Sequence, residues 1–405
     1  MSFVANRLKV IKPSPTLAVS AKAAKLKAEG KDVIAMGAGE PDFDTPQFIK
    51  DAAIAAMNKG FTKYTAAGGT PSLKRAISAK FKRENGLDYS EKQILVSCGG
   101  KQTSFNLCMS LLNPGDEAIV PAPFWVSYPD MAMMADAKPV FVHAGIEQGF
   151  KITPQQLERA ITPRSRLIWI NSPSNPTGAV YTADELKALG AVLRKHPRIV
   201  IATDDMYEHI LLDGSKFVNI LNVCPDLYPQ TVTMNGVSKA YSMTGWRIGY
   251  CGGPQELIEA MENVQSHSTS NPASISQYAA EAALTGDQSC IDPMVAAFKE
   301  RGQVVAEGLN RIPGVKCLQP DGAFYAFPDC REAIRALHGA GRIAAATDVA
   351  FCEYLMTQPQ GVAAVPGSAF GAEGYLRISF ATSMDNIRKA VDRIAAAVGS
   401  IRVAA

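Results

Sequence analysis

One lysine and one arginine in the segment from Asn235 to Tyr250 are spaced to hold a single cofactor by two of its groups. The segment reads NGVSKAYSMTGWRIGY, with Lys239 in a turn of small and hydroxyl residues and Arg247 eight positions later. An amine on a short turn can form a Schiff base with an aldehyde, and a guanidinium at the start of the next apolar strand can bind a phosphate bidentately. The pair therefore indicates a cofactor that carries both an aldehyde and a phosphate. An ordinary solvated turn is the alternative for so short a motif.

Two glycines open a second candidate phosphate site. Gly99 and Gly100 follow the apolar run QILVSC and precede a helical pattern that continues through Lys101 and Gln102. The free backbone N–H groups and the positive dipole end of a helix suit a phosphate. A tight turn without a ligand is the alternative.

Acidic and phenolic side chains follow another apolar run, RIVIAT. Asp204 and Asp205 come directly after it, and Tyr207 follows. A carboxylate at the end of a buried strand is costly unless a cation or a hydrogen-bond donor meets it, and a protonated pyridine nitrogen would be such a partner. The alternative is a helix N-cap, where aspartate is favoured.

An amide and an indole could contact the same pyridine ring that the carboxylate would meet. Asn175 lies in SPSNPTG after the run RLIWIN, and a cis bond to Pro176 would fix this amide in a tight turn. Asn175 and Tyr207 could both hydrogen-bond a phenolic oxygen, while Trp125 offers a flat face to a heteroaromatic ring. A plain β-turn and a core tryptophan are the alternatives.

Arg377 lies within YLRISFA, where its neighbours are apolar. A buried arginine needs an anion, and a substrate carboxylate is one candidate. An internal ion pair is the other.

The elements that hold these residues alternate between short apolar runs and helical patterns as far as about residue 290. The runs are continuously apolar, as expected of strands covered on both faces, so the pattern predicts an α/β fold with a mostly parallel central sheet flanked by helices. Beyond residue 290 a long helix and short strand-like runs predict a smaller α+β unit. We therefore predict a large domain over residues 46–290 and a small domain made of residues 1–45 and 291–405.

Three threonines are predicted at helix starts. Thr16, Thr45 and Thr70 precede helical patterns, and proline follows the last two directly. Threonine is a favourable N-cap, and proline is tolerated at the first helical position.

Composition favours small-molecule chemistry in a reducing setting. The 405 residues are 47% hydrophobic and carry a net charge of +3, with no basic block that would indicate nucleic-acid binding. Eight scattered cysteines lack metal-ligand spacing and are predicted to be buried free thiols, so no metal site is expected. The first residues do not read as a signal peptide, and no uncharged apolar run is long enough to span a membrane. We therefore expect a cytoplasmic protein.

Several motifs together resemble those of a known family. They are GEPDFDTP, TKYTAAGGTPSLKRAI, GGKQ, FWVSYP, NSPSNPTGAVY, DDMYEHI, SKAYSMTGWRIGY and YLRISFA, in this order along the chain. This set resembles the class I pyridoxal-phosphate-dependent aminotransferases of fold type I, in particular the bacterial aspartate and prephenate aminotransferase subgroup. The resemblance covers essentially the whole chain.

The resemblance implies a role for each candidate residue. Lys239 would hold pyridoxal 5′-phosphate and move protons, and Asp204 would meet its ring nitrogen. The phosphate would be held by Arg247 and by the backbone at Gly100, Lys101 and Gln102. Tyr207 and Asn175 would bond the ring oxygen, Trp125 would stack on the ring, and Arg377 with Gly39 would receive the substrate's α-carboxylate. Tyr64 would reach the phosphate of a neighbouring subunit, which implies a homodimer with shared sites.

One position departs from the pattern. Many relatives have a hydroxyl residue three positions before the lysine, where this chain has Gly236. Ser238 or another group would then have to supply the missing phosphate contact.

The resemblance also bears on the substrate. By this resemblance, the second acid group of a dicarboxylate would be bound by Lys12, Ser14, Thr16 and Lys101. The first expectation is therefore aspartate or glutamate as amino donor, with oxaloacetate or 2-oxoglutarate as the 2-oxo acid. Prephenate or an aromatic amino acid is the alternative, since Lys12 resembles a lysine of prephenate-using members, although a solvated lysine is equally compatible with the sequence. A β-eliminating lyase on the same fold is a further, less favoured alternative.

Overall fold

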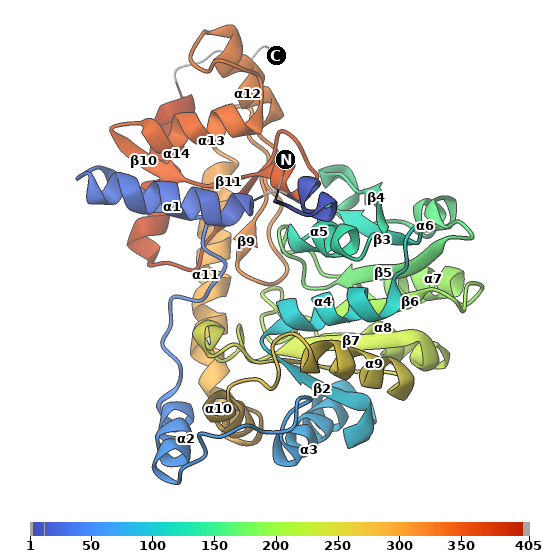
Figure 1. The fold of residues 1–405 in the computed structure, drawn as a ribbon. Coiled ribbons are helices and arrows are strands. Elements are labelled where there is room, and N and C mark those ends of the chain that lie inside the picture. The colour runs from blue at the N-terminus through green and yellow to red at the C-terminus, as the bar shows by residue number, and fades with distance from the viewer. Residues whose placement is uncertain (1–2, 12, 400–405) are drawn as a thin grey trace.

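The computed structural model describes residues 3–11 and 13–399, and its centre is a seven-stranded sheet (Figure 1). The strand order is β2-β8-β7-β6-β5-β3-β4. Strands β3 to β7 pair in parallel, whereas β8 is antiparallel to both of its neighbours, β7 and β2. The bounds are β2 (Ile94–Ser97), β3 (Glu117–Ala122), β4 (Lys138–His143), β5 (Ser165–Asn171), β6 (Val200–Asp204), β7 (Thr231–Gly236) and β8 (Gly249–Gly252). The expected α/β fold with a mostly parallel central sheet is confirmed.

Helices cover both faces of this sheet, which explains why its strands are continuously apolar. One face packs against α4 (Gly100–Leu111), α5 (Ser127–Met134) and α9 (Gln255–Ser266). The other packs against α3 (Pro71–Lys80), α7 (Ala183–Leu193) and α10 (Ser274–Thr285). Every residue of β2, β7 and β8 is buried. Burial on both faces removes the polar alternation of a half-exposed strand.

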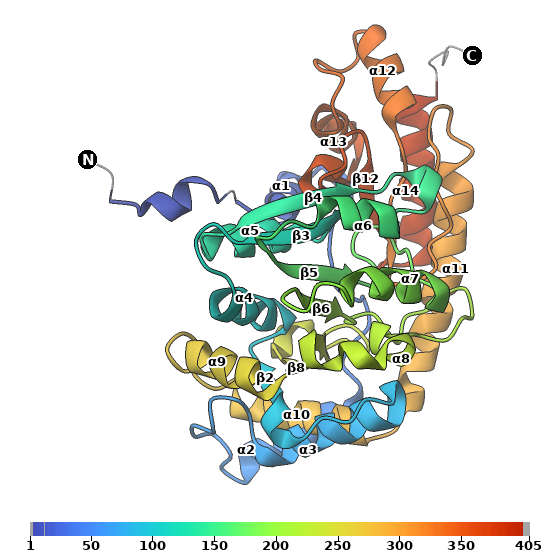
Figure 2. The ribbon, with the colours of Figure 1, turned by 90° about the vertical axis from the view of Figure 1, so that its right-hand side faces the viewer.

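Smaller helices complete this part of the chain. They are α2 (Gln47–Asn58), which packs on α10, and α6 (Pro154–Ala160) and α8 (Ile220–Val223), which both pack near α7. Figure 2 shows α2 and α3 at the end of the molecule opposite α12.

The C-terminal part contains two small sheets, one of which includes a strand from the N-terminal segment. Strand β1 (Asp32–Ala35) pairs in parallel with β10 (Gln360–Ala363), and β12 (Leu376–Ser379) pairs with β11 (Val365–Pro366) and β9 (Tyr325–Ala326). The helices here are α1 (Pro15–Ala28), α11 (Asp292–Leu309), α12 (Arg331–Gly339), α13 (Asp348–Thr357) and α14 (Met384–Val398). The β1–β10 pairing places the N-terminal segment on the C-terminal part, as expected, while the boundaries at 46 and 290 stay a prediction.

Two of the three expected caps are wrong. Thr70 caps α3 by accepting a hydrogen bond from Leu73 N–H (3.3 Å). Helix α1, however, is capped by Ser14, so Thr16 lies in the first turn. Before α2, Thr45 donates its hydroxyl to the carbonyl of Ser242 (2.7 Å) instead of capping the helix. A long-range partner near the Lys239 turn therefore replaces the local cap.

None of the helices within residues 3–11 and 13–399 combines the length and apolarity that a membrane crossing needs.

Candidate active site

A cavity of about 260 Å³ opens where the carboxyl ends of β5, β6 and β7 face the C-terminal part. This volume far exceeds what one water molecule needs and suits a bound small molecule. The residues that line it and were predicted from the sequence are Ser14, Thr16, Gly39, Gly100, Lys101, Trp125, Asn175, Asp204, Tyr207, Ser238, Lys239, Arg247 and Arg377. The lining residues that were not predicted are Leu17, Val126, Asn171, Met206 and Tyr325.

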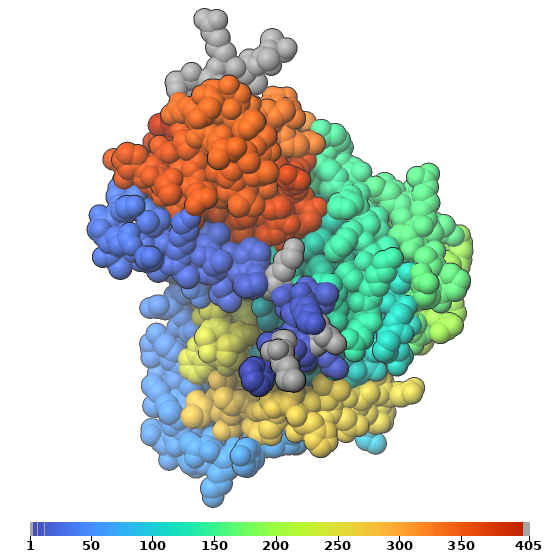
Figure 3. Space-filling model, turned by 45° about the horizontal axis from the view of Figure 1, so that its top comes forward, coloured from blue at the N-terminus to red at the C-terminus, as the bar shows by residue number. Residues whose placement is uncertain are grey.

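Two predicted residues within the described part of the chain do not line this cavity. Tyr64 is 91% exposed. Gln102 lies in the first turn of α4, where its side chain donates to Asn106 (2.7 Å). Lys12 lies outside the described residues. Figure 3 shows the first described residues, in dark blue, on the surface between the orange C-terminal part and the gold segment.

Lys239 lies in the turn that follows β7, and its environment favours the neutral amine. Its Nζ donates to the carbonyl of Gly39 (2.5 Å) and lies 5.9 Å from the ring centre of Phe324. Burial lowers the pKa of Lys239 to about 8, and Arg377 adds to the lowering, against an opposing effect of Glu40. A lysine with this pKa is partly deprotonated near neutral pH, so it can act as a nucleophile and a base.

This pKa predicts the pH dependence of a simple reaction. In the cofactor-free protein, the rate at which Lys239 condenses with an aromatic aldehyde should rise with pH and level off above about 8. The reason is that only the neutral amine attacks, and burial disfavours the ammonium form. Absorbance measurements with Lys239→Ala as the blank would follow the reaction. A rate that keeps rising toward the ordinary lysine value of 10.5 would contradict the buried environment.

Arg247 lies against the start of α4, as the phosphate hypothesis requires. Its Nη1 donates to the carbonyl of Thr244 (2.8 Å), and its Nη2 lies 3.4 Å from the carbonyl oxygen of Cys98. A Cβ at Gly99 would lie only 2.2 Å from Nη2, and Gly99 has φ of +89°, so the close approach depends on glycine. The guanidinium and the first N–H groups of α4 thus face one part of the cavity together.

At Gly236, where the resemblance implies a hydroxyl residue in other members, any side chain would be tightly packed. A Cβ there would lie 3.0 Å from both Met206 Cε and the carbonyl oxygen of Ile248. Met206 therefore occupies the space beside the strand. Ser238 is buried and lines the cavity, so it stays a candidate for the missing phosphate contact.

Asp204 is a buried carboxylate held by a residue that sequence reasoning missed. The hydroxyl of Tyr128 donates to Asp204 Oδ2 (2.5 Å), and Asn171 Nδ2 donates to the Asp204 carbonyl (2.9 Å). Burial raises the pKa of Asp204, since its hydrogen bonds compensate only in part for lost hydration. Tyr128 follows Trp125 by one helical turn, and its ring meets that of Trp125 edge-on at 5.3 Å. This spacing could have identified Tyr128 in the motif FWVSYP.

Arg377 has no acidic partner among the residues 3–11 and 13–399, so the internal ion pair expected as an alternative is absent there. Its side chain is 2% exposed and lies between the rings of Tyr325 (4.7 Å) and Phe370 (4.9 Å). Nη1 donates to Asn175 Oδ1 (2.9 Å) and Nη2 to the carbonyl of Gly37 (2.7 Å), while the buried Nε has no partner. Burial lowers the pKa of Arg377. A buried guanidinium with neutral partners and an orphaned donor is a site for a carboxylate.

The turn that carries Asn175 differs from its expected form. The cis peptide bond is Ser172–Pro173, and the bond to Pro176 is not cis. Asn175 is held instead by its backbone N–H, which donates to Asn171 Oδ1 (2.8 Å), and by Arg377.

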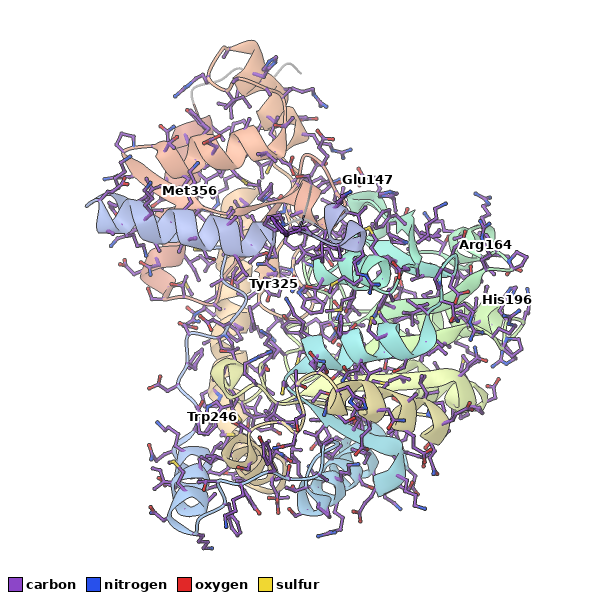
Figure 4. All side chains as sticks on the ribbon, viewed as in Figure 1. Glu147, Arg164, His196, Trp246, Tyr325 and Met356 are labelled. Carbon is purple, nitrogen blue, oxygen red and sulfur yellow. The ribbon has the colours of Figure 1, made fainter. Side chains whose placement is uncertain are left out.

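Tyr325 closes the cavity from the C-terminal part and is labelled in Figure 4 near the junction of the two parts. Its hydroxyl is 2.9 Å from that of Tyr207, so these two phenols form one hydrogen-bonded pair. Among the other lining residues, Lys101 Nζ lies 5.1 Å from the ring centre of Trp125. Thr16 Oγ1 is buried without a partner among the described residues.

Comparison with known proteins agrees with this geometry. The sequence model of the family described as aminotransferase class I and II matches residues 31–394. The chain belongs to this aminotransferase family.

This aminotransferase is 64% identical to the aspartate/prephenate aminotransferase of Nitrosomonas europaea over 97% of its own length and 98% of the relative. Among solved structures, it is similar to the aspartate aminotransferase of Rhizobium meliloti, with a TM-score of 0.92, 47% identity and coverage of 99% and 100% of the two chains. The aspartate aminotransferase of Thermus thermophilus with maleate gives a TM-score of 0.91 at 42% identity, with 98% and 100% covered. The resemblance predicted from the motifs is therefore confirmed.

Proposed function

We propose that this aminotransferase exchanges an amino group between aspartate or glutamate and a 2-oxo acid, oxaloacetate or 2-oxoglutarate, with pyridoxal 5′-phosphate as its cofactor. The observation that carries the proposal is that one cavity holds Lys239, whose pKa is lowered, and the buried Arg377, which has no acidic partner in the described part of the chain. The amine suits an aldehyde cofactor, and the arginine suits the carboxylate that every α-amino acid has.

The residues around the cavity fit this cofactor. Arg247 and the start of α4 would hold the phosphate, with Ser238 nearby, and Trp125 would lie against the ring. Asp204, a buried carboxylate with a raised pKa, gains a cationic partner if a protonated ring nitrogen lies beside it. Asn175 and Tyr207 would donate to the ring oxygen. When bound, pyridoxal phosphate supplies the electron sink that stabilises negative charge at the substrate Cα.

The chain's own residues position the substrate and move the proton. Arg377 would bind the α-carboxylate through its free Nε and fix the Cα beside Lys239, with Gly39 leaving room for the close approach. The neutral amine of Lys239 can then take the Cα proton and later return it. The phenols of Tyr207 and Tyr325 and the Phe324 ring limit the access of water to this amine.

Polar groups at the other end of the cavity support an acidic substrate. Lys101 lies over Trp125, and Ser14 and Thr16, whose hydroxyl has no partner among the described residues, line the same cavity. Burial and the nearby Arg247 lower the pKa of Lys101, and a second carboxylate would relieve both effects. We propose that these groups, with Lys12, bind the distal carboxylate. Prephenate is the second candidate, because the Nitrosomonas relative is named for both substrates.

A substrate panel tests this specificity. We expect kcat/KM to be highest for aspartate or prephenate and much lower for phenylalanine and alanine. Lys101→Met should lower kcat/KM for the two acidic substrates about tenfold to a hundredfold, since a charge-assisted hydrogen bond contributes about 1.5 to 3 kcal/mol, and should change that for alanine little. A preference for alanine or phenylalanine would reject the acidic specificity. Release of pyruvate and ammonia from a β-substituted amino acid would instead indicate a lyase.

We also propose a homodimer in which Tyr64 reaches the phosphate of the partner subunit. The support is the 91% exposure of Tyr64 together with the exposure of Ile54, Met57 and Phe61, which precede it closely in sequence. Sedimentation should give the mass of a dimer, and Tyr64→Phe should weaken cofactor binding about tenfold or more because a hydrogen bond to a charged group is lost. Unchanged affinity in a confirmed dimer would remove Tyr64 from the site.

The eight cysteines support a cytoplasmic setting, which we also propose. None of them is in a disulfide, and six are buried, whereas Cys98 and Cys290 are only half-buried. Thiol titration of the native and the unfolded protein should find the buried six only after unfolding.

A further inference from the structure

A buried polar cluster lies behind Asp204 and Tyr207, outside the cavity. Its centre is Lys80, the last residue of α3, whose side chain is fully buried. The ammonium donates to the carboxylate of Glu208 and to Asn85 Oδ1 (2.8 Å). Glu208 is 5% exposed and follows Tyr207 directly in the chain. The proposed chemistry uses neither member of this ion pair.

Both carboxylate oxygens of Glu208 are occupied by donors from different elements. Oε1 accepts from Lys80 and from Asn235 Nδ2 (2.8 Å), while Oε2 accepts from Asn85 Nδ2 (2.6 Å). Asn235 belongs to β7, the strand that leads into the Lys239 turn. The carboxylate thus joins the segment from Asp204 to Tyr207 to the strand that leads into the Lys239 turn.

The surrounding groups keep Glu208 ionised. Burial alone would raise the pKa of Glu208, but Lys80 and His209 lower it below its ordinary value. Glu84 lies beside this pair, 3.5 Å from Lys80 and 2.9 Å from His209, and its pKa falls to about 2. Glu84, Glu208 and His209 lie close enough together to resemble a metal site, yet the ammonium of Lys80 already supplies the cation there.

An irregular backbone turn brings two further polar residues into the cluster. A π-helical turn, Phe81–Asn85, follows α3 and supplies Glu84 and Asn85 to the cluster. Such turns are rare and interrupt the regular helix. Because a buried ion pair is often no more stabilising than apolar side chains of the same size, stability alone does not account for this arrangement.

We infer that Glu208 and Lys80 are positioning residues, which fix the Asp204–Tyr207 turn relative to Lys239. The inference rests on the proposed function, in which Asp204 and Lys239 act on one bound cofactor from two different strands. Small errors in such geometry are costly to a reaction rate even where the fold survives. Glu208 is the group that bridges the two segments, and Lys80 holds its charge and orientation.

Variants of the whole enzyme test this inference. Glu208→Gln and Lys80→Met remove one partner each, and Glu117→Gln is the matched control. Glu117 is also nearly buried and accepts from Arg164 (2.8 Å) and Thr162 (2.6 Å), but at the start of β3, away from the cavity. We would measure Tm, kcat, KM and the pH midpoint of the visible absorbance of the bound cofactor, which reports on the Lys239 environment.

We expect Glu208→Gln and Lys80→Met to lower kcat about tenfold or more, to change KM less, and to shift the pH midpoint. Glu117→Gln should lower only Tm. The double variant Lys80→Met/Glu208→Leu removes both buried charges, so it should regain part of the lost Tm while kcat stays low, because the link to Asn235 is still missing.

Recovery of kcat in the double variant would overturn the inference, as would single variants that lose only stability like the control. A wild-type protein without cofactor absorbance and transamination would instead reject the proposed function, and the inference with it. If the single variants do not fold, the kcat of the double variant decides the inference.

Discussion

Lys239→Ala is expected to abolish transamination and the visible absorbance of the lysine-bound cofactor. The lysine is both the group that attaches the cofactor and the base that moves the Cα proton. General acid–base catalysis alone contributes about 10² to 10⁴-fold in rate, so a loss of at least about 10³-fold is expected. Spectra and steady-state kinetics at saturating substrate would measure both effects.

The variant should remain folded. The pKa of Lys239 in the cofactor-free protein is about 8, below the ordinary 10.5, so folding disfavours the ammonium form. This penalty is fully present below pH 8 and disappears as pH rises toward 10.5, so the alanine variant should gain most in relative stability at neutral and lower pH. Lys151→Ala serves as the control, because Lys151 is a half-buried lysine paired with Glu185 (2.8 Å). Full activity with retained absorbance in Lys239→Ala would reject the assignment.

Arg377→Ala is expected to weaken the use of every amino acid, whatever its side chain. The α-carboxylate would lose its only proposed cationic partner in a buried site, which costs about 3 to 5 kcal/mol, or roughly 10² to 10⁴-fold in kcat/KM. The same factor should apply to aspartate, prephenate, phenylalanine and alanine. Competitive inhibition by simple carboxylates should weaken in parallel.

Arg331→Ala is the matched control for this substitution. Arg331 also lies over an aromatic ring, 5.3 Å from that of Tyr375, but it pairs with Asp329 outside the cavity. Its loss should leave the kinetics unchanged. If Arg377→Ala impaired only acidic substrates, Arg377 would belong to the distal end of the substrate site.

The sequence predicts the cavity residues at the ends of the central strands, but it does not predict the one that the C-terminal part contributes. Asp204 ends β6, while Asn175 and Lys239 follow β5 and β7, and parallel strands bring their carboxyl ends to one edge. Tyr325 reaches the cavity from the other sheet system, so no local pattern marks it. Its role depends on how the two parts pack, which the sequence does not encode in any short segment.

Local rules also failed where distant partners compete. Thr45 satisfies every local criterion for an N-cap, yet its hydroxyl donates to the carbonyl of Ser242. Local rules do not predict the partner of Lys80 either, because a lysine at the end of an amphipathic helix is normally exposed. Only the structure shows that its side chain turns inward to Glu208. Side chains recruited by tertiary contacts are therefore the part of the site that could not be predicted.

The pairing of β1 with β10 has a consequence for biosynthesis. Strand β1 leaves the ribosome more than 300 residues before its partner β10 (Gln360–Ala363) and before Arg377. The seven-stranded sheet is complete in sequence by β8 and can form on the nascent chain, but β1 must wait for the C-terminal strands. A growing chain can therefore acquire the Lys239 turn well before it acquires the proposed carboxylate site, so substrate selection has to wait for the C-terminal strands.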